Sequence, residues 1–174
     1  MEFTFETVYD QKAVTAMARG LRKTSRKKHS HRSHVLGWLM IALVLLLTLP
    51  RNGEPLAIEG RTILTWAVGV TLLVTLLFED KINAWFARRR MMKGTDRAVS
   101  TFTEGGYCSE TAAGKTEWRY ENIAHIAEDA HYFIFVFDKR YAQVYAKQGM
   151  GGGTVEEFRD FIVRMTGKEI QYIR

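Results

Sequence analysis

The chain has 174 residues, one cysteine and a formal net charge of +6. A single cysteine excludes an intrachain disulfide framework and a multi-cysteine metal site. The basic excess does not indicate a nucleic-acid-binding domain, because residues 98–174 contain nine basic and eleven acidic residues and the positive charge lies in the N-terminal half. Nucleic acid is therefore not an expected partner.

The first segment, residues 1–10, has the alternation of a half-buried β-strand. Phe3 and Phe5 alternate with polar residues. A strand needs a partner in a sheet, and no further strand pattern occurs before residue 97. We therefore expect this strand to join the sheet of the C-terminal region.

Residues 11–32 predict a basic juxtamembrane helix. Asp10 can cap it, and an apolar stripe at helical spacing follows at Val14, Met17, Ala18 and Leu21. The segment has eight Lys and Arg residues and no acid. We expect the helix to continue as far as the apolar run that follows, with its basic face among anionic lipid headgroups. A specific lipid or nucleotide site on this basic patch is the alternative.

Three histidines, His29, His31 and His34, stand at the end of that segment. Two of them are one helical turn apart, which is compatible with a metal site or a pH sensor. No acidic residue lies near them in the sequence to complete a site or orient a ring. We interpret them as histidines at the membrane–water interface, and their role stays open.

Two apolar runs, residues 33–50 and 62–78, contain no Asp, Glu, Lys or Arg. At about 1.5 Å per residue they reach ~25 to 27 Å, against a hydrocarbon core of about 30 Å. They predict two transmembrane helices joined by an external loop, residues 51–61. The alternative is a pair of buried core helices in a soluble protein.

The charges beside the two runs predict their orientation. Residues 11–32, just before the first run, hold eight basic and no acidic residues, and residues 79–97 hold six basic and three acidic residues. The loop at 51–61 has two of each sign. By the positive-inside rule, both termini are cytoplasmic.

Residues 79–94 predict a basic interfacial helix, in which Trp85 and Phe86 precede three arginines. Two groups of candidate membrane-surface residues result. The basic patch comprises Arg22, Lys23, Arg26, Lys27, Lys28, Arg32, Arg88, Arg89 and Arg90, and the interfacial aromatics are Trp38, Trp85 and Phe86.

From residue 95 the pattern changes to short alternating runs separated by turn residues, which predicts an antiparallel meander over residues 95–174. Residues 131–137 are apolar on both faces and predict its central strand. A Gly-rich loop at 148–153 could cradle a phosphate, but it lacks the Gly-Lys-Ser/Thr ending of a P-loop. Thr154 and Glu157 form a capping box before an amphipathic C-terminal helix.

The acidic residues and histidines of this region have the spacing of solvated surface residues, with Glu128 and Asp129 in a turn. The sequence has no Ser-His-Asp, His-Glu-x-x-His or nucleotide motif. We expect no enzymatic activity, no catalytic residue, no cofactor and no metal.

Several positions of the C-terminal region resemble the YcxB-like family of bacterial membrane proteins. They are Tyr120-Glu-Asn-Ile123, Ile126, Glu128, the aromatic strand from Tyr132 to Phe137, Val144-Tyr-Ala-Lys147 and Glu156-Glu-Phe158. The resemblance implies an α+β membrane protein: two transmembrane helices plus a small antiparallel pleckstrin-homology-like (PH-like) barrel, capped by the C-terminal amphipathic helix. It also implies a multi-pass protein of the bacterial inner (cytoplasmic) membrane.

Our functional hypothesis is a non-enzymatic inner-membrane protein whose cytoplasmic PH-like domain, residues 95–174, binds a protein or a lipid next to the membrane. The expected partners are the lipid bilayer, through its anionic headgroups, and a protein. Association into a homo-oligomer stays open. The alternative is an immunity protein that neutralises a toxin acting at the bacterial inner membrane.

Overall fold

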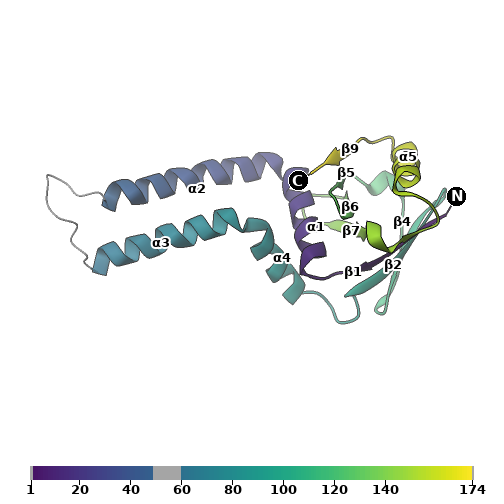
Figure 1. The fold of residues 1–174 in the computed structure, drawn as a ribbon, viewed down its shortest axis with the longest axis horizontal. Coiled ribbons are helices and arrows are strands. Elements are labelled where there is room, and N and C mark those ends of the chain that lie inside the picture. Colours follow the sequence, from purple (N-terminus) through teal and green to yellow (C-terminus); the bar gives the residue numbers. More distant parts are fainter. Residues whose placement is uncertain (1, 49–59, 174) are drawn as a thin grey trace.

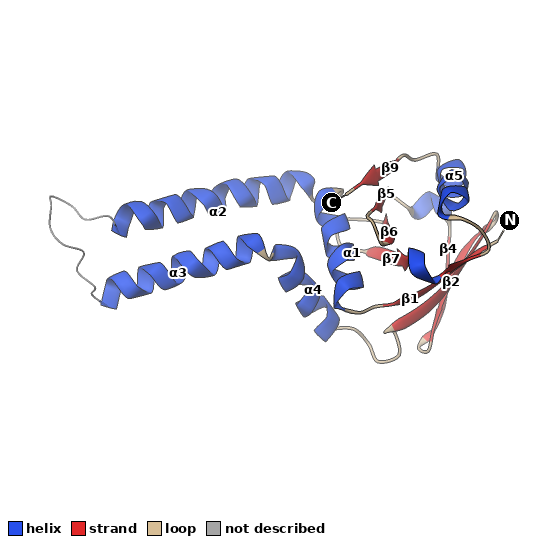
Figure 2. Cartoon of the chain, viewed as in Figure 1, coloured by secondary structure: helices blue, strands red, loops and turns tan. Residues whose placement is uncertain are grey.

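The computed structural model describes residues 2–48 and 60–173, and it consists of a long helical hairpin that projects from one side of an α+β domain (Figure 1). The helices and strands in chain order are β1 (Phe3–Val8), α1 (Gln11–Lys23), α2 (Lys27–Thr48), α3 (Gly60–Leu77), α4 (Glu79–Arg89), β2 (Arg97–Thr103), β3 (Gly106–Thr111), β4 (Gly114–Trp118), η1 (Tyr120–Asn122), β5 (His125–Glu128), β6 (Tyr132–Val136), β7 (Ala142–Ala146), η2 (Lys147–Gly149), β8 (Met150–Gly151), α5 (Val155–Thr166) and β9 (Ile170–Tyr172). Figure 2 shows that the strands all lie in the domain and that the described part of the hairpin is helical.

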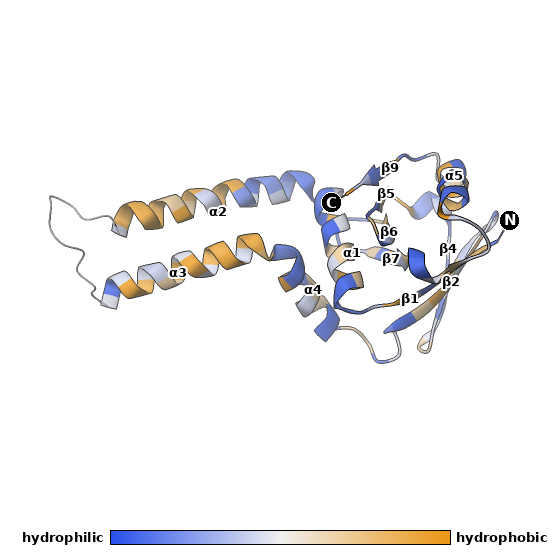
Figure 3. Cartoon of the chain, in the orientation of Figure 1, coloured by the Kyte–Doolittle hydropathy of each residue, from blue (hydrophilic) through white to orange (hydrophobic). Residues whose placement is uncertain are grey.

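The hairpin consists of α2 and α3, which are long and apolar enough, by length and composition, to cross a membrane. The two helices pack closely where Gly37 lies against Leu76 and Gly69 against Val44. Along α2, hydropathy falls toward the domain, whereas α3 stays hydrophobic up to its domain end and the hydrophilic residues begin in α4 (Figure 3). The predicted loop at 51–61 lies outside the described residues, apart from its last two, which begin α3.

The boundary between the basic segment and the first apolar helix differs from the prediction. A single helix over 11–32 is wrong, because α1 ends at Lys23 and a turn follows. The N–H of Thr24 bonds to the carbonyl of Gly20 and the N–H of Arg26 to that of Leu21, which closes α1. The basic residues 27–32 therefore form the first turns of α2, and the apolar helix does not start at residue 33.

The strands form two sheets. A five-stranded sheet has the order β4-β3-β2-β1-β8, and a four-stranded sheet has the order β7-β6-β5-β9. β1 pairs antiparallel with β2, with Phe3 opposite Phe102 and Thr7 opposite Ala98. The predicted N-terminal strand is thus an inner strand of the first sheet, and the hairpin lies between two neighbouring strands in the chain.

Aromatic side chains fill the space between the two sheets and α5. Phe3, Phe5, Phe102 and Phe158 are fully buried there, because strand alternation aims them inward and the capping box of Thr154 and Glu157 starts α5 beside them. The sequence predicted this helix as the last element. The prediction is wrong in one respect, since β9 follows α5 and pairs parallel to β5.

The predicted central strand is β6, which lies between β5 and β7. One of its faces joins the aromatic core through Phe133 and Phe135. The other face, with Ile134 and Val136, packs against α1. The apolar character of both faces therefore results from a helix that covers the sheet on the side of the hairpin.

Candidate functional site

A helix pair, α1 and α4, connects the hairpin to the domain. Arg22 on α1 donates two hydrogen bonds to the Asp80 carboxylate on α4, Nε to Oδ1 and Nη2 to Oδ2, both of 2.7 Å. The hydrogen bond to Asp80 raises the pKa of Arg22 above its ordinary value. Gln11, at the N-terminal end of α1, donates a side-chain hydrogen bond to the carbonyl oxygen of Lys81 on α4. α4 is thereby fixed along α1.

A second contact joins α2 to the same end of α4. His34 Nε2 lies 2.8 Å from Glu79 Oε2. The expectation that no acidic residue stands near these histidines is wrong for His34, because Glu79, the first residue of α4, is 45 residues away in the sequence but adjacent in the fold. His29 and His31 are exposed. The three histidines do not converge on one point.

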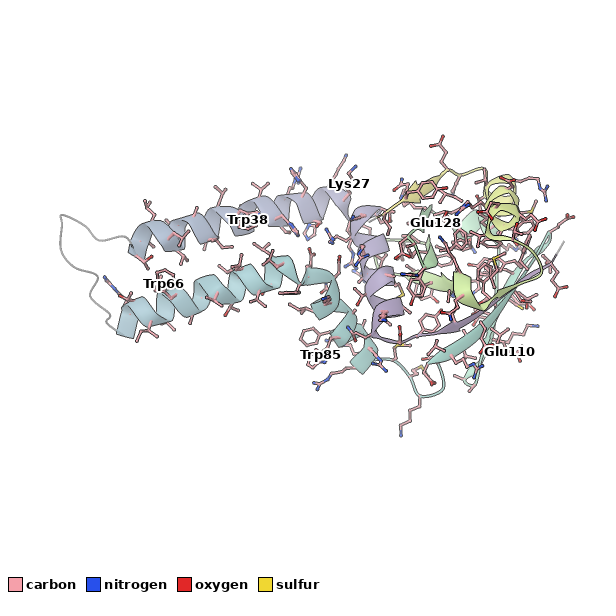
Figure 4. The ribbon with its side chains drawn as sticks, viewed as in Figure 1. Lys27, Trp38, Trp66, Trp85, Glu110 and Glu128 are labelled. Carbon is pink, nitrogen blue, oxygen red and sulfur yellow. The ribbon has the colours of Figure 1, made fainter. Side chains whose placement is uncertain are left out.

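A basic cavity of about 770 Å³ lies where the foot of α2 meets the domain, and we call it the stem groove. Its lining consists of Thr24, Ser25, Arg26, Lys27, Lys28, His29, Arg32, His125, Lys139 and Arg140. Six of these side chains are Lys or Arg, and among the described lining residues there is no carboxylate. Figure 4 shows Lys27 at the domain end of α2.

The groove has a defined shape because its two walls are joined by a hydrogen bond. Arg26, in the turn between α1 and α2, donates its Nε–H to the carbonyl oxygen of Lys139 in the β6–β7 turn, at 2.5 Å. That turn is itself fixed by Asp138, whose Oδ1 accepts the backbone N–H groups of Arg140 and Tyr141 at 2.6 Å each. These backbone bonds lower the pKa of Asp138. The exposed side chains of Lys139 and Arg140 are therefore attached to a rigid turn.

The structure separates the predicted basic patch into three groups. Arg26, Lys27, Lys28 and Arg32 line the stem groove. Arg22 is held by Asp80, and the pKa of its neighbour Lys23 is lowered, chiefly by partial burial and then by Arg22 and Arg19. Residues 88–90 lie at the other end of α4.

The predicted interfacial aromatics also fall in two places. Trp85 and Phe86 are exposed on α4, with ring centroids 4.9 Å apart. The guanidinium of Arg89 lies 3.9 Å from the Trp85 ring centroid. Trp38 is separate from them, about half exposed on α2 (Figure 4).

Sequence reasoning missed the three residues that the domain contributes to the groove, His125, Lys139 and Arg140. The pattern Asp138-Lys139-Arg140 has the composition of an ordinary turn between two strands. Its contact with Arg26 spans 113 residues of sequence, and no local pattern carries that information. A turn with two adjacent cations was the one available signal.

The Gly-rich loop is a structural feature of the sheet and not an open phosphate cradle. Part of it forms β8, which pairs with β1. A Cβ atom at Gly149 would overlap the carbonyl oxygen of Glu6, and one at Gly152 would overlap that of Glu2. The glycines are needed because β1 passes directly against this loop.

Glu128 differs from the expected solvated turn residue, because it is only 1% exposed at the end of β5. It accepts hydrogen bonds from Lys147 Nζ at 2.6 Å and Arg159 Nη2 at 2.8 Å. Burial alone would raise the pKa of Glu128, but the bonds from Arg159 and Lys147 outweigh it and lower the pKa. This ion triad joins β5, η2 and α5 and leaves Glu128 fully engaged.

Comparison with protein-family models, with curated proteins and with solved structures gives no match to this chain. A concave surface with six cationic side chains can bind anions by charge and by hydrogen bonds from guanidinium and ammonium groups.

Proposed function

We propose that this chain is a non-enzymatic protein of the bacterial inner membrane, anchored by the α2–α3 hairpin, with a cytoplasmic PH-like domain that binds a protein or lipid partner next to the bilayer. Both chain termini lie on the cytoplasmic side in this proposal. The resemblance to the YcxB-like family supports it, together with two sheets that enclose an aromatic core beside a C-terminal helix.

The exposure of the hairpin is the observation that carries the proposal. Leu36, Leu47 and Leu64 are each more than 60% exposed, and they belong to continuous apolar surfaces on α2 and α3. Soluble monomers rarely expose apolar patches of more than a few hundred Å². Core helices of a soluble protein would be covered by the fold, and here the domain covers only the foot of the hairpin.

The junction supports a domain held against the bilayer and not on a flexible linker. The hairpin leaves the domain from β1 through α1 and returns through α4 to β2. α1 packs on β6 and β7, and α4 is fixed to α1 by Arg22 and Asp80. Trp85 and Phe86 face outward from α4 beside arginines, as expected for residues at the headgroup boundary.

A topology experiment tests the anchor. A reporter that is active only outside the cytoplasm should give a signal when fused after Glu54 and none when fused after Arg174. The opposite pattern would end the proposal. Affinity capture of the whole protein in mild detergent then separates a binding module, which retains a host partner, from an immunity protein, which retains a toxin.

A further inference from the structure

The stem groove brings together cations from two parts of the chain. Arg26 belongs to the turn between α1 and α2, and Lys27, Lys28 and Arg32 to the foot of α2, whereas Lys139 and Arg140 belong to the β6–β7 turn. Like charges held within one cavity repel each other. A bound anion would reduce this repulsion.

The protein supplies little charge compensation of its own at this place. Asp138 is the acid of the β6–β7 turn, and its Oδ1 already accepts two backbone N–H groups. Glu79 and Asp80 are engaged by His34 and Arg22 in the α1–α4 contact. Even with Asp138 counted, the six Lys and Arg side chains retain an excess of five positive charges.

The groove has room for more than one phosphate group. A water molecule takes about 30 Å³ of liquid volume, and a phosphate group takes only a few times as much. A cavity of about 770 Å³ is therefore larger than one phosphate requires.

We infer that the stem groove binds an anion with two phosphate groups, one held by the foot of α2 and the other by Lys139 and Arg140. The inference rests on the proposed membrane anchor, since that places the groove at headgroup depth. A lipid headgroup with two phosphates and a soluble diphosphate present the same chemistry. Occupancy would strengthen the junction that the Arg26–Lys139 hydrogen bond already makes between the α1–α2 turn and the β6–β7 turn.

The test uses the whole chain reconstituted in nanodiscs of phosphatidylcholine. In one arm diphosphatidylglycerol is added, and in a second arm phosphatidylglycerol is added at twice that concentration. Native mass spectrometry counts the lipid bound in each arm. A third arm adds inorganic pyrophosphate without anionic lipid. These arms compare two linked phosphates with two separate ones, and a lipid source with a soluble source.

The variant is Lys139→Gln with Arg140→Gln. It should keep the turn intact, because the bonds that fix the turn use the Lys139 carbonyl and the Arg140 backbone N–H. The matched control, Arg88→Gln with Arg90→Gln, removes the same charge from the far end of α4. Circular dichroism and incorporation into the nanodisc check the fold and the anchor in both variants.

We expect the groove variant to bind diphosphatidylglycerol roughly 30-fold more weakly, about fivefold for each cation lost, and the control to change by about twofold. Tight pyrophosphate binding with the same dependence on Lys139 and Arg140 would support the diphosphate site and assign it to a soluble ligand. Equal losses in both variants, or equal binding of the two lipids per phosphate, would overturn the inference. A chain that does not enter the nanodisc would instead count against the membrane anchor, and the pyrophosphate arm would still test the groove.

Discussion

The guanidinium of Arg22 and the carboxylate of Asp80 face each other across the α1–α4 contact and share two hydrogen bonds of 2.7 Å. The Arg22 side chain is 25% exposed and that of Asp80 is 14% exposed. Water therefore screens this pair only in part, and the pair couples the outgoing and returning stems of the hairpin.

Asp80→Asn should lower the free energy of unfolding by about 1–3 kcal/mol, since a charged partner is lost from a half-buried pair. Thermal unfolding in detergent measures this change. The exchanged pair, Arg22→Asp with Asp80→Arg, should recover part of it in a double-mutant cycle. Coupling close to zero would show that the pair does not stabilise the junction.

Glu128→Gln should cost about 2–4 kcal/mol at neutral pH, because it leaves Lys147 and Arg159 without their shared carboxylate. Glu156→Gln is the control, since Glu156 is exposed and also contacts Arg159. A loss as large in the control as in the variant would count against the triad.

The same pair of variants predicts a pH dependence. The pKa of Glu128 in the folded protein lies below its ordinary value of 4.5. The contribution of the ionised carboxylate to the free energy of unfolding is therefore complete above pH 4.5 and is lost as the pH falls through the folded-state pKa. The difference in unfolding free energy between the wild-type protein and Glu128→Gln should therefore shrink on acidification. A difference that is independent of pH down to strongly acidic conditions would contradict the assignment. Chemical denaturation at a series of pH values provides the measurement.

Phe5→Ala should destabilise the domain by about 3–5 kcal/mol, because Phe5 is fully buried on β1 among the core rings. Phe86→Ala removes the same group from an exposed position on α4 and should have a much smaller effect on unfolding. Limited proteolysis of the C-terminal region reports the outcome. Equal protease resistance in both variants would mean that β1 is dispensable to the sheet.

Gly152→Ala should destabilise the protein more than Gly105→Ala does. Gly152 has a φ of +88°, and an added Cβ would overlap the carbonyl oxygen of Glu2, whereas Gly105 has open space around it. The comparison holds the substitution constant and changes only its surroundings. Similar melting temperatures for the two variants would refute the close approach of β1.

Patterns within one element were readable from the sequence, and so was one long-range pairing, because a lone strand needs a sheet, but side-chain contacts between distant elements were not. The alternation of Phe3 and Phe5 predicted a strand that joins the C-terminal sheet, and the capping box predicted the start of α5. The break after Lys23 was missed, because residues 24–32 lack an apolar stripe that would show where one helix ends. Glu128 and Lys139 were assigned to ordinary turns, since their partners lie on other elements.

The pairing of β1 with β2 across the hairpin has a consequence for synthesis of the protein. The ribosome completes β1 first, but its partner strand ends only at residue 103, so at 5–20 residues per second β1 waits roughly 5 to 20 s for a neighbour. Under the proposed topology, the hairpin inserts into the membrane during that interval. The domain can then close only on chains whose two helices return to the same side, so completion of the sheet would act as a check on correct insertion.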